Sequence, residues 1–195
     1  MTTPLHGPVG QPSPWLLRWA HLLPRQGSAL DLACGRGRHL RWLAGQGLQA
    51  TGVDRDAQAL AGLQPVAGLE LVLADVEADP WPLPGRTFDA VLVFNYLWRP
   101  LWPQILAALA PGGLLICETF ALGQQTVGRP SRPDFLLQAG ELLMRCQGLR
   151  VLAYEDGFEL GPERFVQRVV AVRPRPGDSA PDQPPRYALQ PTGTP

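Results

Sequence analysis

The chain has 195 residues, 45% of them hydrophobic, which suits one globular domain with a sizeable core. Its 17 basic and 17 acidic residues balance to zero formal charge, which argues against binding nucleic acid or an anionic membrane through a broad basic surface. The three cysteines have no CxxC spacing, so a disulfide framework and a zinc site are both disfavoured.

The first 119 residues predict alternating helices and strands. Ser13 and Pro14 are typical of a helix start, and Pro24 ends the helix expected over 15–23. Strands are then expected at 28–34, 48–54, 69–74, 88–94 and 114–119, and helices at 38–46, 56–63 and 100–110. This alternation is typical of a parallel sheet with right-handed crossovers.

The pattern changes after this alternating region. A polar loop over 121–133 precedes a predicted helix at 135–146. Two strands are expected at 149–154 and 165–172, separated by turn residues at Asp156-Gly157 and Gly161-Pro162. We interpret these two strands as a hairpin that closes the sheet.

The predicted elements divide the chain into three parts. Residues 15–173 form the domain. The Pro- and Gly-rich segment 1–14 is expected to be flexible, and the Pro-rich tail 174–195 is expected to be disordered.

A glycine turn follows the first predicted strand. Gly35 and Gly37 permit positive φ angles and let a ligand approach the backbone closely. A dinucleotide fingerprint would place a third small residue where this chain has Leu40, and a P-loop would need a lysine, which the chain lacks. Asp31, inside the strand, would repel a phosphate but suits an ammonium group and a sulfonium charge. The turn therefore favours S-adenosylmethionine over a dinucleotide and disfavours a nicotinamide-dependent oxidoreductase.

Two further acids follow the next two predicted strands. Asp54 ends the strand at 48–54, where a carboxylate can accept hydrogen bonds from both ribose hydroxyls of a nucleoside. Asp75 follows the strand at 69–74. Each acid alone is explained better by a helix cap or a turn, but together with the glycine turn they predict a nucleoside site at one edge of the sheet.

These segments resemble the class I S-adenosylmethionine-dependent methyltransferases. The resemblance rests on residues 30–37, 52–54, 74–76, 88–91 and 109–115 and covers 28–173. It implies an α/β, Rossmann-like, doubly wound seven-stranded sheet, mostly parallel with an antiparallel last strand and helices on both faces. Within the family, the chain is similar to small bacterial members of the tellurite-resistance and thiopurine methyltransferase type.

The resemblance also implies which residues bind S-adenosylmethionine. Asp31 and the glycine turn would face the methionine end, Asp54 would bind the ribose, and Asp75 with Val76 would lie beside the adenine. The full set of expected cofactor contacts is Asp31, Ala33, Cys34, Gly35, Gly37, Arg38, Asp54, Arg55, Asp75, Val76 and Asn95.

Catalytic residues are expected at the carboxyl ends of the fourth and fifth predicted strands. Asn95 and Tyr96 follow the fourth strand, and Glu118 lies near the end of the fifth. For Asn95 a strand-to-helix cap is an equal alternative, and for Glu118 a salt bridge with a nearby arginine is. In the long loop that follows, Arg129 and Arg132 either bind an anionic acceptor or are solvated surface residues.

We therefore expect a methyltransferase acting on a small-molecule acceptor, as a monomer or homodimer and without a metal. A methyltransferase that modifies RNA or protein with a partner, and an inactive regulatory protein that binds the cofactor, are the alternatives. The amino-terminal sequence lacks a signal-peptide pattern and no stretch is apolar enough to span a membrane, so a cytoplasmic location is expected.

Overall fold

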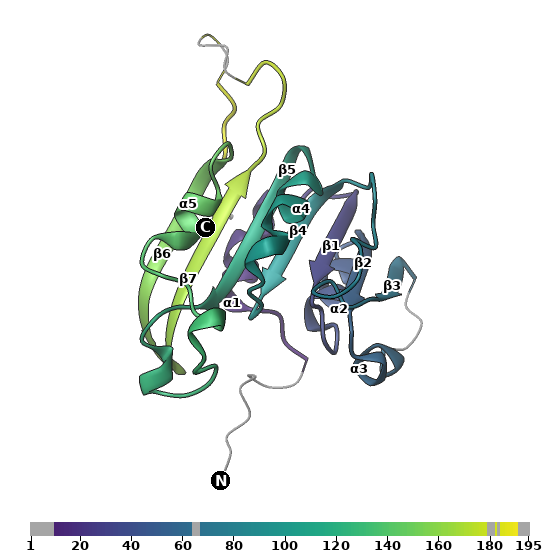
Figure 1. The fold of residues 1–195 in the computed structure, drawn as a ribbon. Helices are drawn as coiled ribbons and strands as arrows, with labels where there is room; N and C mark the ends of the chain where they lie inside the picture. The colour runs from purple at the N-terminus through teal and green to yellow at the C-terminus, as the bar shows by residue number, and fades with distance from the viewer. Residues whose placement is uncertain (1–9, 64–66, 179–181, 183, 191–195) are drawn as a thin grey trace.

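The protein folds around one seven-stranded sheet (Figure 1). The computed structural model describes residues 10–63, 67–178, 182 and 184–190. The strands lie in the order β3-β2-β1-β4-β5-β7-β6, and only the pairings of β7 with β5 and with β6 are antiparallel. Their bounds are β1 Ser28–Leu32, β2 Gln49–Asp54, β3 Leu69–Leu73, β4 Phe88–Phe94, β5 Leu109–Phe120, β6 Arg150–Leu160 and β7 Glu163–Val172. This is the predicted mostly parallel, doubly wound sheet.

Helices cover both faces of the sheet. The α-helices are α1 Pro14–Trp19, α2 Arg38–Gly45, α3 Ala57–Ala61, α4 Trp102–Ala107 and α5 Glu141–Arg145. Short 3-10 turns lie at η1 Ala20–Leu22, η2 Arg99–Leu101, η3 Gln124–Thr126 and η4 Pro133–Phe135. Ser13 caps α1 as predicted, since its hydroxyl accepts a hydrogen bond from the Trp15 backbone N–H.

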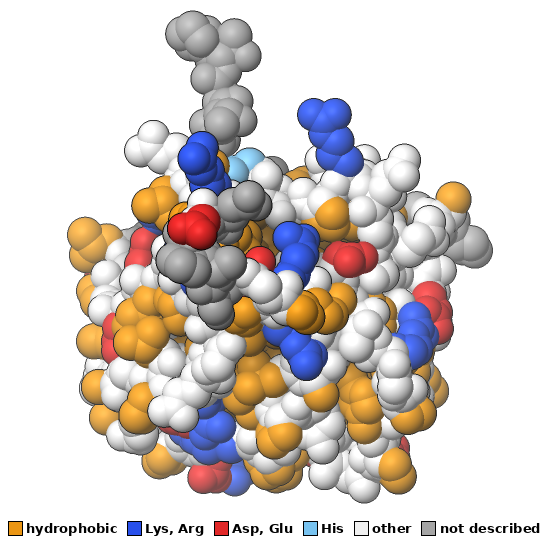
Figure 2. All heavy atoms as spheres, turned by 90° about the horizontal axis from the view of Figure 1, so that it is seen from above, with side chains coloured by type: hydrophobic (Ala, Val, Ile, Leu, Met, Phe, Trp, Pro, Cys, Tyr) orange, Lys and Arg blue, Asp and Glu red, His pale blue; other side chains and the backbone are white. Residues whose placement is uncertain are grey.

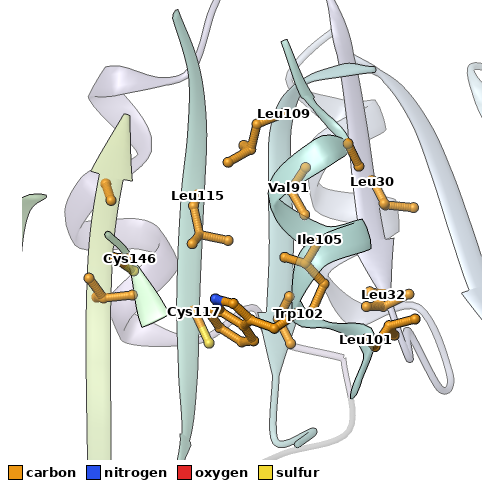
Figure 3. Packing of buried hydrophobic residues seen from close by; sticks show 14 of the residues in the cluster. Leu30, Leu32, Val91, Leu101, Trp102, Ile105, Leu109, Leu115, Cys117 and Cys146 are labelled. Carbon is orange, nitrogen blue, oxygen red and sulfur yellow. The ribbon is translucent and has the colours of Figure 1, made fainter. Parts of the chain in front are cut away.

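Alternation along the central strands builds two separate cores. In β4, Val91 and Val93 face one core, whereas Leu92 faces the other. The first core packs against Trp102 and Ile105 of α4 (Figure 3). The second core contacts α1, α2 and α3. Because β4 is buried on both faces, all of its residues except Asp89 are apolar, as is typical of parallel strands.

Two boundaries in the centre of the chain differ from the prediction. The helix expected at 100–110 ends at Ala107, and β5 begins at Leu109 instead of residue 114. Leu109 pairs with Phe88, and the pairing resumes with Leu114 opposite Ala90 after an irregularity. The Pro-Gly-Gly turn at 111–113 is therefore a distortion within the strand pairing and does not precede the strand.

The carboxyl-terminal elements also differ from the prediction. The helix expected at 135–146 is confined to α5, because Leu137 exchanges backbone hydrogen bonds with Phe120 and Leu122. The expected turn at Asp156-Gly157 lies inside β6, where Gly157 pairs with Val166 of β7. The hairpin is thus longer than its apolar residues indicate.

Parts of the two terminal segments lie outside the described residues. These parts are 1–9 of the amino-terminal segment and 179–181, 183 and 191–195 of the tail. Within the described tail, Tyr187 packs against the second core, and the Ala188 carbonyl lies 2.9 Å from His21 Nε2. Among the described residues, no helix has the length and apolar character required to cross a membrane.

Gly52 allows α2 to pack closely on β2. A Cβ at this position would overlap Leu40 Cδ1 and lie 2.9 Å from Cys34 Sγ. We expect Gly52→Ala to destabilise the protein by about 1–3 kcal/mol through overpacking. Gly45→Ala is the matched control, because a Cβ there would meet nothing within 4 Å. Urea unfolding would measure both, and equal stability of the two variants would contradict this packing role.

Candidate functional site

A cavity of about 500 Å³ opens at the carboxyl edge of the sheet. In Figure 1 the arrows of β1 and β4 point toward this edge, at the lower end of the sheet. The lining comes from the ends of five neighbouring strands and from the loop after β5. The lining residues are Ala33, Val53, Asp54, Arg55, Ala74, Asp75, Val76, Glu77, Asn95, Tyr96, Leu97, Thr119, Phe120, Arg129, Pro130 and Phe135.

Asp54 joins the glycine turn to the end of β2. Its Oδ2 accepts a hydrogen bond of 2.7 Å from the Gly35 N–H, and its Oδ1 accepts one of 2.9 Å from the Asp56 N–H. A carboxylate has about four lone-pair sites, so two remain for a ligand. A Cβ on Gly35, whose φ is +53°, would meet nothing within 4 Å. The turn is therefore fixed by Asp54 while its glycine faces open space.

Asp75 adds a second acid to the same wall. Its Oδ1 accepts a hydrogen bond from the Glu77 N–H, and its Oδ2 lies 3.5 Å from Arg55 Nη1. The Arg55 side chain is mostly exposed, so this ion pair contributes little to stability. The wall formed by β2 and β3 thus carries three carboxylates and one loosely held cation.

Two lining residues have left-handed backbone conformations. Ala33 has a φ of 55° and Asn95 a φ of 54°, and among the described residues these are the non-glycine positions with positive φ. Such conformations cost about 1–3 kcal/mol and concentrate at functional sites. The Asn95 N–H donates to the Glu118 carbonyl, which holds the turn after β4 against β5.

The Tyr96 hydroxyl is buried in this wall and forms no hydrogen bond with the described residues. Burial raises the pKa of Tyr96, and the nearby carboxylates of Glu77 and Asp75 raise it further. The phenol therefore stays neutral near pH 7 and retains a proton that it can donate.

Six of the expected site residues do not line the cavity. The buried Cys34 packs in the second core, where burial raises the pKa of its thiol, and Gly37 forms the left-handed N-cap of α2. Asp31 is also buried, and its Oδ2 lies 3.7 Å from His39 Nδ1 and makes no hydrogen bond within the described part of the chain. Arg38 is half-buried, and this burial lowers the pKa of its guanidinium overall. The nearby charges of Glu118 and Asp31 oppose that effect but do not cancel it. The remaining two are Gly35, in the turn beside the cavity, and Glu118.

For Glu118 the structure contains the salt bridges that the sequence suggested as the alternative to a catalytic role. Its side chain is 1% exposed and forms ion pairs with Arg164 at 3.2 Å and Arg168 at 2.7 Å. The Ser13 hydroxyl donates a further hydrogen bond of 3.4 Å to the same carboxylate. Both arginines lie on the adjacent strand β7, so the partner that the sequence left unidentified comes from the last strand of the chain.

The opposite wall of the cavity belongs to the loop between β5 and α5. Gln124 anchors this loop, because its buried side chain donates to the Arg129 carbonyl at 3.1 Å and accepts from the Phe165 N–H at 2.9 Å. Arg129 lines the cavity, whereas Arg132 pairs with Asp134 outside it. Of the two candidate arginines, only Arg129 is thus placed beside the cavity.

Sequence reasoning missed several lining residues. Thr119 and Phe120 lie at a strand end, as Ala74 and Leu97 do, so the topology rule that identified Asn95 could have found them. Pro130 and Phe135 belong to the loop, where residue spacing predicts no geometry.

Arg99 and Glu141 fasten the far end of this loop. Arg99 donates to the carbonyls of Asp134 and Leu136 and to the Glu141 carboxylate. Burial alone would raise the pKa of Glu141, but hydrogen bonds from Arg99, the Gln138 N–H and Arg145 lower it from 4.5 to about 2. The ionised carboxylate therefore stabilises the fold above pH 4.5, by about 3 kcal/mol, and this stabilisation is lost as the pH falls toward 2.

We expect Glu141→Gln to lower stability at pH 6 and to reduce the loss of stability between pH 6 and pH 3. Chemical unfolding at both pH values measures this. Glu163→Gln, at an exposed position, is the control and should behave as the unsubstituted protein does. An unchanged pH dependence in Glu141→Gln would show that this carboxylate does not hold the loop.

Sequence comparison finds methyltransferases. The model of a family described as "Methyltransferase domain" matches residues 29–113. A tRNA U34 carboxymethyltransferase from Pseudoalteromonas translucida (strain TAC 125) is 32% identical over 122 residues, 54% of this chain and 37% of that protein. A trans-aconitate 2-methyltransferase from Paracidovorax citrulli (strain AAC00-1) is 36% identical over 98 residues, 46% of this chain and 37% of that protein. The chain thus spans little more than a third of the length of these two relatives.

Structure comparison finds the same fold. A SAM-dependent methyltransferase from Methanosarcina mazei superposes with a TM-score of 0.66 at 14% identity, covering 85% of this chain and 100% of that one. TehB from Haemophilus influenzae gives a TM-score of 0.62 at 18% identity, covering 76% and 58%. Because both identities are below 25%, these superpositions show that the fold is shared and nothing about the substrate.

Proposed function

We propose that this chain is a class I S-adenosylmethionine-dependent methyltransferase that binds the cofactor at the carboxyl edge of its sheet and methylates a small-molecule acceptor there. One observation carries the proposal: the Asp54 carboxylate is held beside the glycine turn by the Gly35 N–H and still has acceptor sites free toward the cavity. The acceptor is a nucleophile that enters beside Asn95 and Tyr96.

The residues present fit S-adenosylmethionine. Asp54 would accept hydrogen bonds from the ribose hydroxyls, and Asp75 and Val76 would line the adenine pocket. The open space before Gly35 leaves room for the ligand to approach the backbone. Asp31 does not line the cavity, but its buried Oδ2 makes no hydrogen bond with the described residues, and a carboxylate four residues before Gly35 would suit the ammonium end.

When bound, the cofactor supplies a methyl group on positively charged sulfur, whose transfer to a nucleophile leaves a neutral thioether and adds the methyl to the acceptor. The protein's task is to orient the acceptor and exclude water. Leu97, Phe120 and Phe135 present apolar surface to the cavity. Tyr96, kept neutral by burial and its acidic neighbours, can donate a hydrogen bond that orients the acceptor.

A small-molecule acceptor agrees with the charge pattern. Figure 2 shows the end of the molecule away from the cavity, where arginines and acidic side chains are interspersed among uncharged ones. The formal net charge of the whole chain is zero. A protein that binds nucleic acid electrostatically is expected to carry a basic patch. The named relatives leave the acceptor class open, since one modifies tRNA and the other trans-aconitate. A macromolecular acceptor recognised through a partner is the second candidate.

Isothermal titration calorimetry with S-adenosylmethionine, S-adenosylhomocysteine and NADH tests the proposal. We expect binding of both sulfur nucleosides with a dissociation constant on the order of micromolar and no binding of NADH. Absence of binding by either sulfur nucleoside would overturn the cofactor site.

A further inference from the structure

Arg129 is the cation on the acceptor side of the cavity. The acids that line the cavity, Asp54, Asp75 and Glu77, all come from the ends of β2 and β3. Arg55 lies on that same side and pairs with Asp75. Arg129 reaches the cavity from the loop after β5 and forms no ion pair with the described residues. Its charge is therefore available to a ligand.

The backbone around Arg129 is fixed before any ligand binds. Gln124, 3% exposed, holds the Arg129 carbonyl, and the Gly128 N–H donates to the Gln124 carbonyl at 2.9 Å. At the base of the loop, the Leu122 N–H donates to the Leu137 carbonyl. A cation carried on an anchored loop loses less entropy on binding a ligand than one on a loose loop.

Arg132 lies in the same loop as Arg129, but its charge is already compensated by an ion pair. Its Nη2 lies 3.0 Å from Asp134 Oδ2, and its guanidinium lies 5.1 Å from the Phe135 ring centroid. It does not line the cavity. The two arginines, three residues apart, thus make a matched pair in which only Arg129 faces the cavity.

Aromatic side chains surround the space next to Arg129. Tyr96, Phe120 and Phe135 line the cavity from β4, β5 and the loop. The Tyr96 hydroxyl is buried and makes no hydrogen bond with the described residues. Flat apolar walls favour an aromatic ring, and one guanidinium matches one carboxylate in a bidentate pair.

We propose that the acceptor is an aromatic carboxylate whose carboxylate pairs with Arg129 and whose ring lies among Tyr96, Phe120 and Phe135. This inference rests on the proposed function, because it assigns the part of the cavity that the cofactor would leave free. The guanidinium contributes affinity and orientation, and the ring contributes buried apolar surface.

Calorimetry on protein saturated with S-adenosylhomocysteine tests the proposal, with 4-hydroxybenzoate as the probe and 4-hydroxybenzamide as its uncharged counterpart. We expect the acid to bind at least ten-fold more tightly than the amide. Arg129→Gln should remove this preference, and the matched variant Arg132→Gln should retain it. Both variants should bind S-adenosylhomocysteine as the unsubstituted protein does. Arg129 enters the cavity from the loop after β5, whereas the expected nucleoside contacts follow β2 and β3, and Arg132 does not line the cavity.

Three results would overturn the proposal: absent binding of the acid, equal binding of acid and amide, or a preference that survives Arg129→Gln. Phenyl phosphate serves as a further arm, and tighter binding of this dianion would overturn the choice of a carboxylate. Failure of S-adenosylhomocysteine itself to bind would refute the proposed function. Intact cofactor binding without discrimination between acid and amide would refute only the assignment of the acceptor.

Discussion

Replacing Asp54 with Ala is expected to weaken binding of S-adenosylhomocysteine by about 100-fold or more. The substitution removes the acceptors for the ribose hydroxyls, and hydrogen bonds to a charged group contribute about 1.5–3 kcal/mol each. It also leaves the Gly35 N–H without its 2.7 Å partner, so the glycine turn loses its support. Calorimetric titration of the folded variant measures the effect.

Asp56→Ala is the matched control for this experiment. Asp56 lies two residues further along and caps α3, accepting hydrogen bonds from the Gln58 and Ala59 N–H groups at 2.9 and 3.0 Å. Its loss should cost about 1 kcal/mol of stability and leave cofactor affinity nearly unchanged. Equal affinities for the Asp54 and Asp56 variants would remove Asp54 from the proposed site.

Glu118→Ala is expected to destabilise the fold by about 3 kcal/mol or more. The substitution leaves the largely buried guanidinium groups of Arg164 and Arg168 without their central carboxylate, and breaking a buried ion pair typically costs about 3–5 kcal/mol. For a domain of this size the melting temperature should fall by roughly 6–12 °C, as calorimetric scanning would show.

The same experiment separates the two roles considered for Glu118. If Glu118 contacts the acceptor, its substitution should lower activity and leave the melting temperature constant. If Glu118 holds the buried ion-pair network, its substitution should first lower the melting temperature. Glu155→Ala is the control: Glu155 pairs with Arg168 and Arg18 but is about 41% exposed, so its loss should cost less than about 1 kcal/mol. Equal melting temperatures for the two variants would show that the network does not depend on Glu118.

The sheet, and the edge at which the cavity opens, could be predicted from sequence because each signal was local. Apolar runs bounded by turns located the strands, and parallel strands must place their carboxyl ends on one edge. Asp54 and Asp75 therefore lie at one cavity as predicted. The bounds of β4, 88–94, agree with the prediction, because every residue of the strand except Asp89 is apolar.

What could not be predicted depends on contacts between distant residues. The loop carrying Arg129 owes its position to Gln124 and Phe165, which are 41 residues apart. The salt bridges of Glu118 span 46 residues to Arg164 and need the register of β5 against β7. Without that register, a single sequence shows that an acid and several arginines are present but not which of them form pairs. The helix expected at 135–146 was wrong for the same reason, since Leu137 pairs with residues earlier in the chain.

The placement of β7 between β5 and β6 has a consequence for the order of folding. The central strand β5 has no partner on its outer edge until residues 163–172 exist. Trp15 of α1 packs in the same core as Val170 of this late hairpin. During synthesis, the contacts of α1 with this hairpin can therefore form only after nearly the whole domain has been made. Such long-range closure makes folding slow and cooperative, and leaves the edge of β5 exposed on the growing chain until the last strand arrives.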